Sequence, residues 1–299
     1  MPQRLCLDTR TKVNAWLRVE PLRPCETLHR ITSLFLPLAF GDRLTVSATP
    51  SATPDFQLTS NRPDLVVGNT VEAAWRAFLA AFQGSSVPAL AVAARLDKRV
   101  AGQTGLGSGS GDAGSMLNAL NTLHGKPFDK AQLNVIARSV GSDVPFFVDP
   151  CSCIVSGDGS EITCLPPFGS LHCCLVIPRF RVSTGEAYRA LDQLMLTQSE
   201  QVGIPMAKMQ DVLNALARRR PLRPAGTCLN VFERVLGENA AIVAQIREVL
   251  DSCGAILSTL TGSGSAVFGI YEERAAAVAA ARSVRRAIDT AQTVVTPVV

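Results

Sequence analysis

The chain has 299 residues, of which 47% are apolar and 18% are charged, and its net charge is +4. This length is at the upper limit for one hydrophobic core, so the sequence predicts two globular domains and excludes a disordered chain. Residues 31–41, the longest weakly polar stretch, are too few for the about 20 apolar residues of a transmembrane helix. Because Asp8, Arg10 and Lys12 interrupt any apolar run near the start, we expect no secretory signal, no membrane partner and a cytoplasmic location.

Basic residues and cysteines exclude further classes of protein. The dense basic run at 218–223 closes a helical pattern, where cations offset the helix dipole, so we expect no nucleic-acid partner. The nine cysteines lie mostly in apolar segments, which favours reduced thiols over a disulfide framework. Cys151 and Cys153 could share a metal ion only with two more ligands, and the three histidines provide no second pair at ligand spacing. We therefore expect no structural metal site.

The first half of the chain combines strands and helices. Apolar residues at every second position predict strands at 5–7, 13–19, 44–46 and 90–96. Apolar residues at helical spacing predict helices at 69–82, 116–123 and 129–140. A hairpin is predicted at 153–165, and Pro166-Pro167 is the expected boundary between a domain 1–167 and a domain 168–299.

The second half of the chain also combines strands and helices. Its apolar runs predict strands at 173–177, 255–260, 266–271 and 293–298. A capping box at Ser183 and Glu186 predicts the start of a helix, and further helices are expected near 206–218 and 239–250, with an alanine-rich helix before the last strand. Strands and helices do not alternate strictly as in a doubly wound sheet. The sequence therefore predicts a two-domain α+β fold.

Six glycines between Gly102 and Gly114 separate a predicted strand from a predicted helix. Glycine lets backbone N–H groups approach a phosphate closely, and a following helix adds its positive end, so this segment is expected to hold a polyanion. A flexible linker is less favoured, because linkers rarely join a strand to an amphipathic helix. A P-loop is excluded because Asp112, and not lysine, follows Gly111. The GxGxxG match at 109–114 is far from the amino terminus, and no strand that ends in an acidic residue follows it about 20 residues further on, as a dinucleotide fold requires.

The segment 105–113, with the sequence Gly-Leu-Gly-Ser-Gly-Ser-Gly-Asp-Ala, resembles the phosphate loop of the GHMP kinase superfamily. Further blocks resemble segments of that superfamily in the same order along the chain: Lys12-Val-Asn14-Ala-Trp-Leu-Arg-Val19, His29 to Phe35 followed by Phe40-Gly41-Asp42, Gly141-Ser-Asp143-Val-Pro145-Phe146-Phe147, and Gly262-Ser-Gly264-Ser-Ala-Val-Phe268-Gly269. Together the blocks extend over almost the whole chain.

This resemblance implies a GHMP kinase-like fold with the active site in the cleft between two domains. It implies ATP with Mg²⁺ as phosphate donor, a small molecule as acceptor, and a monomer or homodimer. The branch of the superfamily that the blocks resemble most phosphorylates the 2-hydroxyl of 4-diphosphocytidyl-2-C-methyl-D-erythritol, a step of non-mevalonate isoprenoid synthesis.

The resemblance also implies roles for individual residues. Asp143 would take the proton of the acceptor hydroxyl, and Lys12 would orient Asp143 and offset the developing charge. Asn14, His29 and Tyr188 would contact the substrate. The nucleotide would be held by the loop residues Ala101, Gly102, Gln103, Thr104, Gly105, Leu106, Gly107, Ser108, Gly109, Ser110 and Gly111.

The residues by themselves leave simpler roles open. Asp143 follows Gly141 and could be a helix cap, and Lys12 could be an exposed lysine at a strand edge. His29 could be a structural histidine, and Asn14 a polar residue at a strand edge.

The chain also departs from the family pattern. Ala101-Gly102 and Ser110-Gly111 replace Pro-Met and Ser-Ser in the phosphate loop, and Leu28 replaces a tyrosine that would stack on cytosine. These departures leave two alternatives, a GHMP kinase for another small alcohol and a non-catalytic relative that binds nucleotide.

Overall fold

A computed structural model describes residues 3–23, 26–82, 89–197, 204–222, 227–288 and 292–299. The chain forms two compact units, one made of residues 1–11, 40–102 and 107–150, the other of residues 12–39, 103–106 and 151–299. Two units were expected, but they do not follow the single expected boundary at Pro167. Residues 12–39 and 151–167 belong to the second unit because they form strands of its sheet.

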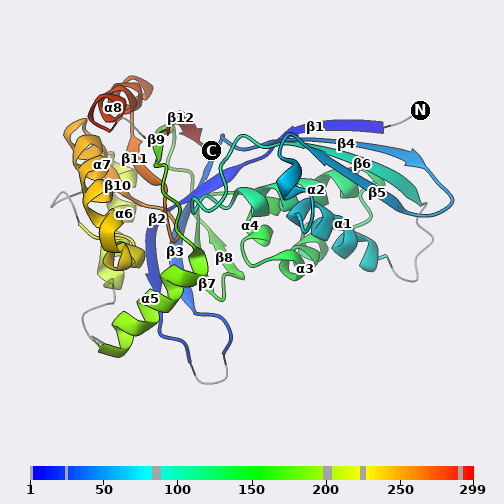
Figure 1. The fold of residues 1–299 in the computed structure, drawn as a ribbon, viewed down its shortest axis with the longest axis horizontal. Coiled ribbons are helices and arrows are strands. Elements are labelled where there is room, and N and C mark those ends of the chain that lie inside the picture. Colours follow the sequence, from blue (N-terminus) through cyan, green and yellow to red (C-terminus); the bar gives the residue numbers. More distant parts are fainter. Residues whose placement is uncertain (1–2, 24–25, 83–88, 198–203, 223–226, 289–291) are drawn as a thin grey trace. The chain divides into compact units, whose positions relative to one another are not determined.

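The first unit is a four-stranded sheet with helices on one face (Figure 1). The strand order is β1 (Gln3–Asp8), β4 (Arg43–Pro50), β6 (Leu90–Asp97) and β5 (Asp55–Ser60), and only the β5–β6 pair is parallel. The helices are α1 (Thr70–Ala80), α2 (Ser108–Leu123), α3 (Lys130–Val140) and α4 (Val144–Val148), and a 3₁₀ turn η1 spans Pro63–Leu65. Strand β5 and helix α4 were not predicted from the sequence.

The core of the first unit follows from its sequence periodicities. Alternate residues of β4 and β6, such as Leu44, Val46 and Leu96, point at the helices and are fully or almost fully buried. The stripe of α1 with Val71 and Phe78 packs into the same cluster. Asn69 accepts a hydrogen bond from the Val71 N–H and caps α1, as its sequence position predicts.

The second unit contains an eight-stranded sheet. Its strand order is β10 (Leu257–Leu260), β11 (Val267–Tyr271), β9 (Leu171–Ile177), β12 (Gln292–Val298), β3 (Ile31–Leu38), β7 (Cys153–Gly157) and β8 (Glu161–Cys164), with β2 (Thr11–Val19) paired to β3. The helices are α5 (Thr184–Thr197), α6 (Met206–Arg218), α7 (Ala240–Ser252) and α8 (Arg274–Ala287), with 3₁₀ turns η2 (Val231–Val235) and η3 (Gly237–Asn239). Figure 1 shows α7 and α8 beside β10, β11 and β9. None of the helices in the described ranges is long and apolar enough to cross a membrane.

One cysteine pair differs from the expectation of reduced thiols. Cys151 and Cys164 form a disulfide with a Cα–Cα distance of 6.2 Å. The expectation was wrong here because the β7–β8 hairpin pairs Cys153 with Cys164 and so places Cys164 near Cys151, a contact that sequence spacing does not show. Cys153 remains a free thiol, and burial raises its pKa to about 12. Cys25 and Arg223 lie outside the described residues.

The glycine segment is shorter as a loop than the sequence suggests, because α2 already begins at Ser108. Gly111 and Gly114 are therefore helical residues, and they are required for close packing. A Cβ at Gly111 would lie 2.1 Å from the carbonyl oxygen of Arg10, and one at Gly114 would lie 2.7 Å from Cβ of Phe147. Gly111, where the family pattern has serine, thus has no room for a side chain.

We expect Gly111→Ala to lower the free energy of unfolding by about 2 kcal/mol, because overpacking against backbone outweighs the gain of about 1 kcal/mol in helix propensity. Gly109→Ala is the matched control in the same helix. A Cβ at Gly109 would make an ordinary contact of 3.5 Å with Thr70 Oγ1. Urea unfolding of both variants measures the difference, and equal midpoints would contradict this account of Gly111.

Candidate active site

Asn14 is the centre of a buried hydrogen-bond network in the second unit. Its Oδ1 accepts hydrogen bonds from Lys12 Nζ at 2.7 Å, from the Gly262 N–H at 2.8 Å and from the Thr261 hydroxyl at 3.1 Å. Its Nδ2 donates to Ser33 Oγ at 2.8 Å. Asn14 is only 2% exposed, so it is not the polar strand-edge residue of the simpler interpretation.

Lys12 is held beside Asn14 because both residues point to the same face of β2. The Lys12 side chain is 4% exposed, and its Nζ lies 4.7 Å from the ring centroid of Phe35. Its backbone N–H donates to the carbonyl of Leu106, a glycine-loop residue of the same unit, at 2.9 Å. The interpretation of Lys12 as an exposed strand-edge lysine is therefore wrong. A buried ammonium at a fixed position can stabilise negative charge far more strongly than one in water.

Two glycine turns meet beside Asn14. A Cβ at Gly105, whose φ is +76°, would lie 2.0 Å from the carbonyl oxygen of Thr261. Gly262, with φ of +55°, is in turn packed against Gly105. The Ala266 N–H donates to the Thr104 carbonyl at 3.1 Å. Glycine at both turns permits this approach, which brings two of the sequence blocks together.

Residues near Asn230 support the second of these turns, the one at Gly262. Asn230 Nδ2 donates to the carbonyls of Leu260 and Gly262 at 2.9 and 2.8 Å. Glu233 accepts from the Thr259 hydroxyl at 2.6 Å and from Arg247 at 2.6 Å. This part of the sequence thus positions the end of β10 and the turn that follows it.

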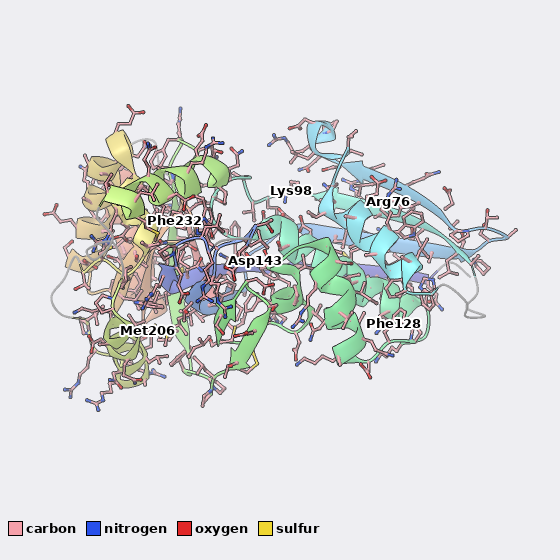
Figure 2. The ribbon with its side chains drawn as sticks, turned by 90° about the horizontal axis from the view of Figure 1, so that it is seen from below. Arg76, Lys98, Phe128, Asp143, Met206 and Phe232 are labelled. Carbon is pink, nitrogen blue, oxygen red and sulfur yellow. A yellow bond between two sulfur atoms is a disulfide. The ribbon has the colours of Figure 1, made fainter. Side chains whose placement is uncertain are left out.

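His29 and Tyr188 form an aromatic cluster in the same unit. Their ring centroids are 5.0 Å apart, and Tyr188 packs edge-on against Phe232 at 4.9 Å. Figure 2 labels Phe232, which lies on η2. His29 Nδ1 lies 2.9 Å from the Glu20 carbonyl and its Nε2 lies 3.3 Å from Asp192 Oδ1. Sequence reasoning did not find Phe232 or Asp192 as members of this cluster, because only folding brings α5 and η2 to His29.

Asp143, which is labelled in Figure 2, and several predicted nucleotide-binding residues belong to the first unit. Asp143 is the N-cap residue of α4, but within the described structure its side chain makes no capping hydrogen bond to that helix. The helix-cap interpretation is therefore not supported by a cap bond. Gly107 is the N-cap residue of α2 and lies in the left-handed region with φ of +67°; as a glycine it provides no side-chain cap to the first N–H groups of the helix.

A second buried cluster lies in the first unit, where three charged side chains from separate segments meet. Lys98 Nζ bonds both Asp42 Oδ2 and, at 3.0 Å, Asp112 Oδ2. Asp42 Oδ1 also accepts the N–H groups of Arg99 and Val100, and the Thr9 hydroxyl donates to Asp112 Oδ1 at 3.0 Å. In the sequence, Asp42 and Asp112 both belong to family blocks, but no local pattern pairs residues so far apart.

The charges in this cluster act on each other strongly. Burial and the nearby Asp42 charge raise the pKa of Asp112 to about 7, although Lys98 and Thr9 oppose that shift. Burial would lower the pKa of Lys98, but the charges of Asp112 and Asp42 outweigh it and raise that pKa. Two carboxylates share one ammonium here, so the second carboxylate is incompletely compensated.

The chain matches two family models. Residues 69–149 match the model for the N-terminal domain of GHMP kinases, and residues 186–290 match the model for their C-terminal domain. It is 31% identical to a 4-diphosphocytidyl-2-C-methyl-D-erythritol kinase of Oleidesulfovibrio alaskensis, over 90% of this chain and 91% of the relative. A relative of the same name from Anaeromyxobacter sp. is 35% identical, over 91% and 84% of the two chains.

The fold also resembles those of solved kinase structures. A crystal structure of 4-(cytidine 5'-diphospho)-2C-methyl-D-erythritol kinase aligns with a TM-score of 0.77 and 26% identity, covering 98% of both chains. A homoserine kinase from Cytophaga hutchinsonii aligns with a TM-score of 0.62 and 18% identity, over 98% and 95% of the two chains, and this likeness concerns the fold alone.

The Asp112 pKa predicts how stability depends on pH. An unfolded Asp112 is ionised above about pH 4, whereas the folded one keeps its proton up to about pH 7, so the folded state binds more protons between these values. The stability that Asp112 gains from binding its proton in the folded state is fully present below about pH 4 and is lost as the pH rises through about 7. From about pH 6 to about pH 8 we expect the wild type to lose about 1 kcal/mol more stability than Asp112→Asn. Thermal melts of both proteins measure this, and parallel pH profiles would contradict it.

Proposed function

Because the chain belongs to the GHMP kinase family, and within it to the 4-diphosphocytidyl-2-C-methyl-D-erythritol kinases, we propose that it transfers the γ-phosphate of ATP to the 2-hydroxyl of 4-diphosphocytidyl-2-C-methyl-D-erythritol. This reaction supplies a precursor in non-mevalonate isoprenoid synthesis. The observation that carries the proposal is the buried Lys12 ammonium fixed by Asn14 beside the Gly262 turn. A buried ammonium held at a fixed position by hydrogen bonds can stabilise negative charge that develops on a transferred group.

The roles proposed for the chain's residues follow from phosphoryl-transfer chemistry. This chemistry needs positioned reactants and compensation of charge on the transferred group more than covalent participation. Asp143 accepts the proton of the acceptor hydroxyl, and Lys12 orients Asp143 and offsets charge on the moving phosphoryl group. The N–H groups at the start of α2 and of the loop from Ala101 bind the nucleotide phosphates, aided by the helix dipole.

Mg²⁺ is proposed to arrive with the nucleotide. The described residues contain no group of three potential protein ligands that could hold a metal ion. Mg²⁺ commonly keeps several waters and binds mainly through substrate phosphates, which fits such a chain. The ion would neutralise charge on the phosphates of ATP.

The aromatic cluster is the proposed place for the cytosine base. Tyr188 contributes an aromatic ring to this cluster, and the polar residues His29 and Asn14 belong to the same unit. The proposal further places the enzyme in the cytoplasm, acting on a free small molecule as a monomer or homodimer. The Cys151–Cys164 disulfide is the feature least typical of that compartment, because disulfides are rare in cytosolic proteins.

A kinase for another small alcohol is favoured by one observation. Leu28, where the family has a stacking tyrosine, is 59% exposed and offers no aromatic face to a base. Single-turnover ATP consumption with a panel of acceptors, including the cytidine substrate and homoserine, separates the two candidates. A protein that consumes ATP with none of them would be the non-catalytic relative.

We expect Asp143→Asn and Lys12→Met to lower turnover by about 10² to 10⁴ while changing nucleotide affinity little, because both act on the transferring group. Methionine removes the charge that lies over the Phe35 ring but keeps an unbranched side chain of similar length. Asp149→Asn is the matched control at the opposite end of α4, since Asp149 is exposed and pairs with Lys130 on the surface. Near-normal turnover in a folded Asp143 or Lys12 variant would return that residue to a structural role.

We expect Leu28→Tyr to lower the Michaelis constant for the cytidine substrate by up to about tenfold, because an aromatic contact contributes about 0.5 to 1.5 kcal/mol beyond area burial. The Michaelis constant for ATP should stay unchanged. Steady-state kinetics of the two proteins measure both constants. A cytidine constant that does not respond, together with equal use of acceptors that lack cytosine, would show that this segment does not contact the base.

A further inference from the structure

We propose that the net charge of the buried Asp42–Lys98–Asp112 cluster controls the affinity of the chain for nucleotide phosphates, and that Asp112 changes this charge by binding a proton. The inference rests on the proposed nucleotide-binding function of the glycine segment, and it assigns to that segment a control by pH. Asp112 acts here through the backbone that it helps to hold and through its charge, so it is a positioning residue.

The cluster holds the chain on both sides of the glycine segment. Asp42 accepts hydrogen bonds from the N–H groups of Arg99 and Val100, the last residues before Ala101. Asp112 lies in the second turn of α2, the helix that follows the segment. Lys98 bonds both carboxylates and so connects the approach to the segment with the helix after it.

The position of Asp112 makes its charge important for anion binding. It is four residues after the first residue of α2, which is about 6 Å along the helix axis. The N–H groups and the positive dipole end of that helix attract phosphate. An uncompensated negative charge beneath the same helix end opposes this attraction. Asp112 is 1% exposed, so solvent ions screen its charge weakly.

The hydrogen bonds indicate which carboxylate takes the proton. Asp42 accepts two backbone N–H groups as well as the Lys98 ammonium. Among the described residues, the side chain of Asp112 accepts hydrogen bonds only from the Lys98 ammonium and the Thr9 hydroxyl. That hydroxyl in turn accepts the Asp42 N–H at 2.9 Å. Asp112 therefore has fewer donors for an ionised carboxylate, in agreement with a pKa raised to about 7 by burial and by the charge of Asp42.

The elements β1, β4 and α3 pack apolar core residues against α2. Arg10, whose carbonyl lies beside Gly111, is exposed to solvent. From α4, Phe147 contacts Gly111 and Gly114, which flank Asp112, and from α1 the Thr70 hydroxyl donates to the Gly109 carbonyl. The charges that act most strongly on Asp112 are thus Asp42 and Lys98. With Asp112 protonated the three groups sum to zero charge, and with Asp112 ionised they sum to one negative charge. Phosphate binding is then stronger below about pH 7 than above it.

The test compares the dissociation constant of ADP for the wild type and for Asp112→Asn by calorimetry from about pH 6 to about pH 8.5. The phosphate of ADP titrates in part of this range, but it does so equally for both proteins. We expect the wild type to lose about three- to tenfold more affinity across the range than the variant. Adenosine, which has no phosphate, should show the same pH profile with both proteins.

A second pair of variants keeps the test decisive if Asp112→Asn does not fold. Thr9→Val removes a donor to ionised Asp112, so the midpoint of the ADP profile should move to higher pH, whereas Thr9→Ser keeps the hydroxyl and should leave it in place. Parallel ADP profiles in wild type and variants would overturn the inference while leaving nucleotide binding intact. A difference that also occurs with adenosine would overturn it, because a phosphate-directed charge cannot act on adenosine. If ADP does not bind at any pH, the proposed function fails together with the inference.

Discussion

The buried amide of Asn14 is the interaction on which the second unit's part of the site depends. One oxygen accepts from a lysine two residues earlier and from a turn more than two hundred residues later. A buried amide that loses such partners leaves their polar groups unsatisfied, which is costly in a low-dielectric interior. The position of Lys12 and the conformation of the turn at Gly262 are therefore coupled, and neither is free to vary without the other.

Glycine serves two separate purposes in this chain. At Gly105 and Gly107 it permits a positive φ, and at Gly105 it also lets the backbone approach the Thr261 carbonyl. At Gly111 and Gly114 the backbone is helical, and glycine is needed only because Arg10 and Phe147 lie where a Cβ would be. The first purpose concerns the surface offered to a ligand, and the second fixes the helix that carries this surface. A replacement can therefore damage the site by unfolding its support.

Each of the two units contains a lysine whose side chain is largely buried. In the second unit the buried Lys12 ammonium donates to the Asn14 amide and lies over the Phe35 ring. In the first unit one ammonium is shared by two carboxylates. A buried group whose charge is incompletely compensated has a shifted pKa, and such groups often lie at functional sites. The cluster beside α2 thus combines support of the backbone with sensitivity to protons.

The sequence by itself determined most helices and strands, because their apolar periods of two or 3.6 residues are local properties. Its ordered blocks identified the kinase family and made Lys12, Asn14 and Asp143 candidates for the site. It did not reveal β5, the start of α2 at Ser108 or the Cys151–Cys164 disulfide, whose signals are weak or depend on distant partners. Only the tertiary structure decided how segments from different parts of the chain combine into the two units. It alone also decided three contacts: Asn14 with Gly262, His29 with Tyr188, and Lys98 with Asp42 and Asp112. The physical reason is that burial, desolvation and hydrogen-bond partners arise from contacts between residues far apart in sequence, and no local pattern of residues encodes such contacts.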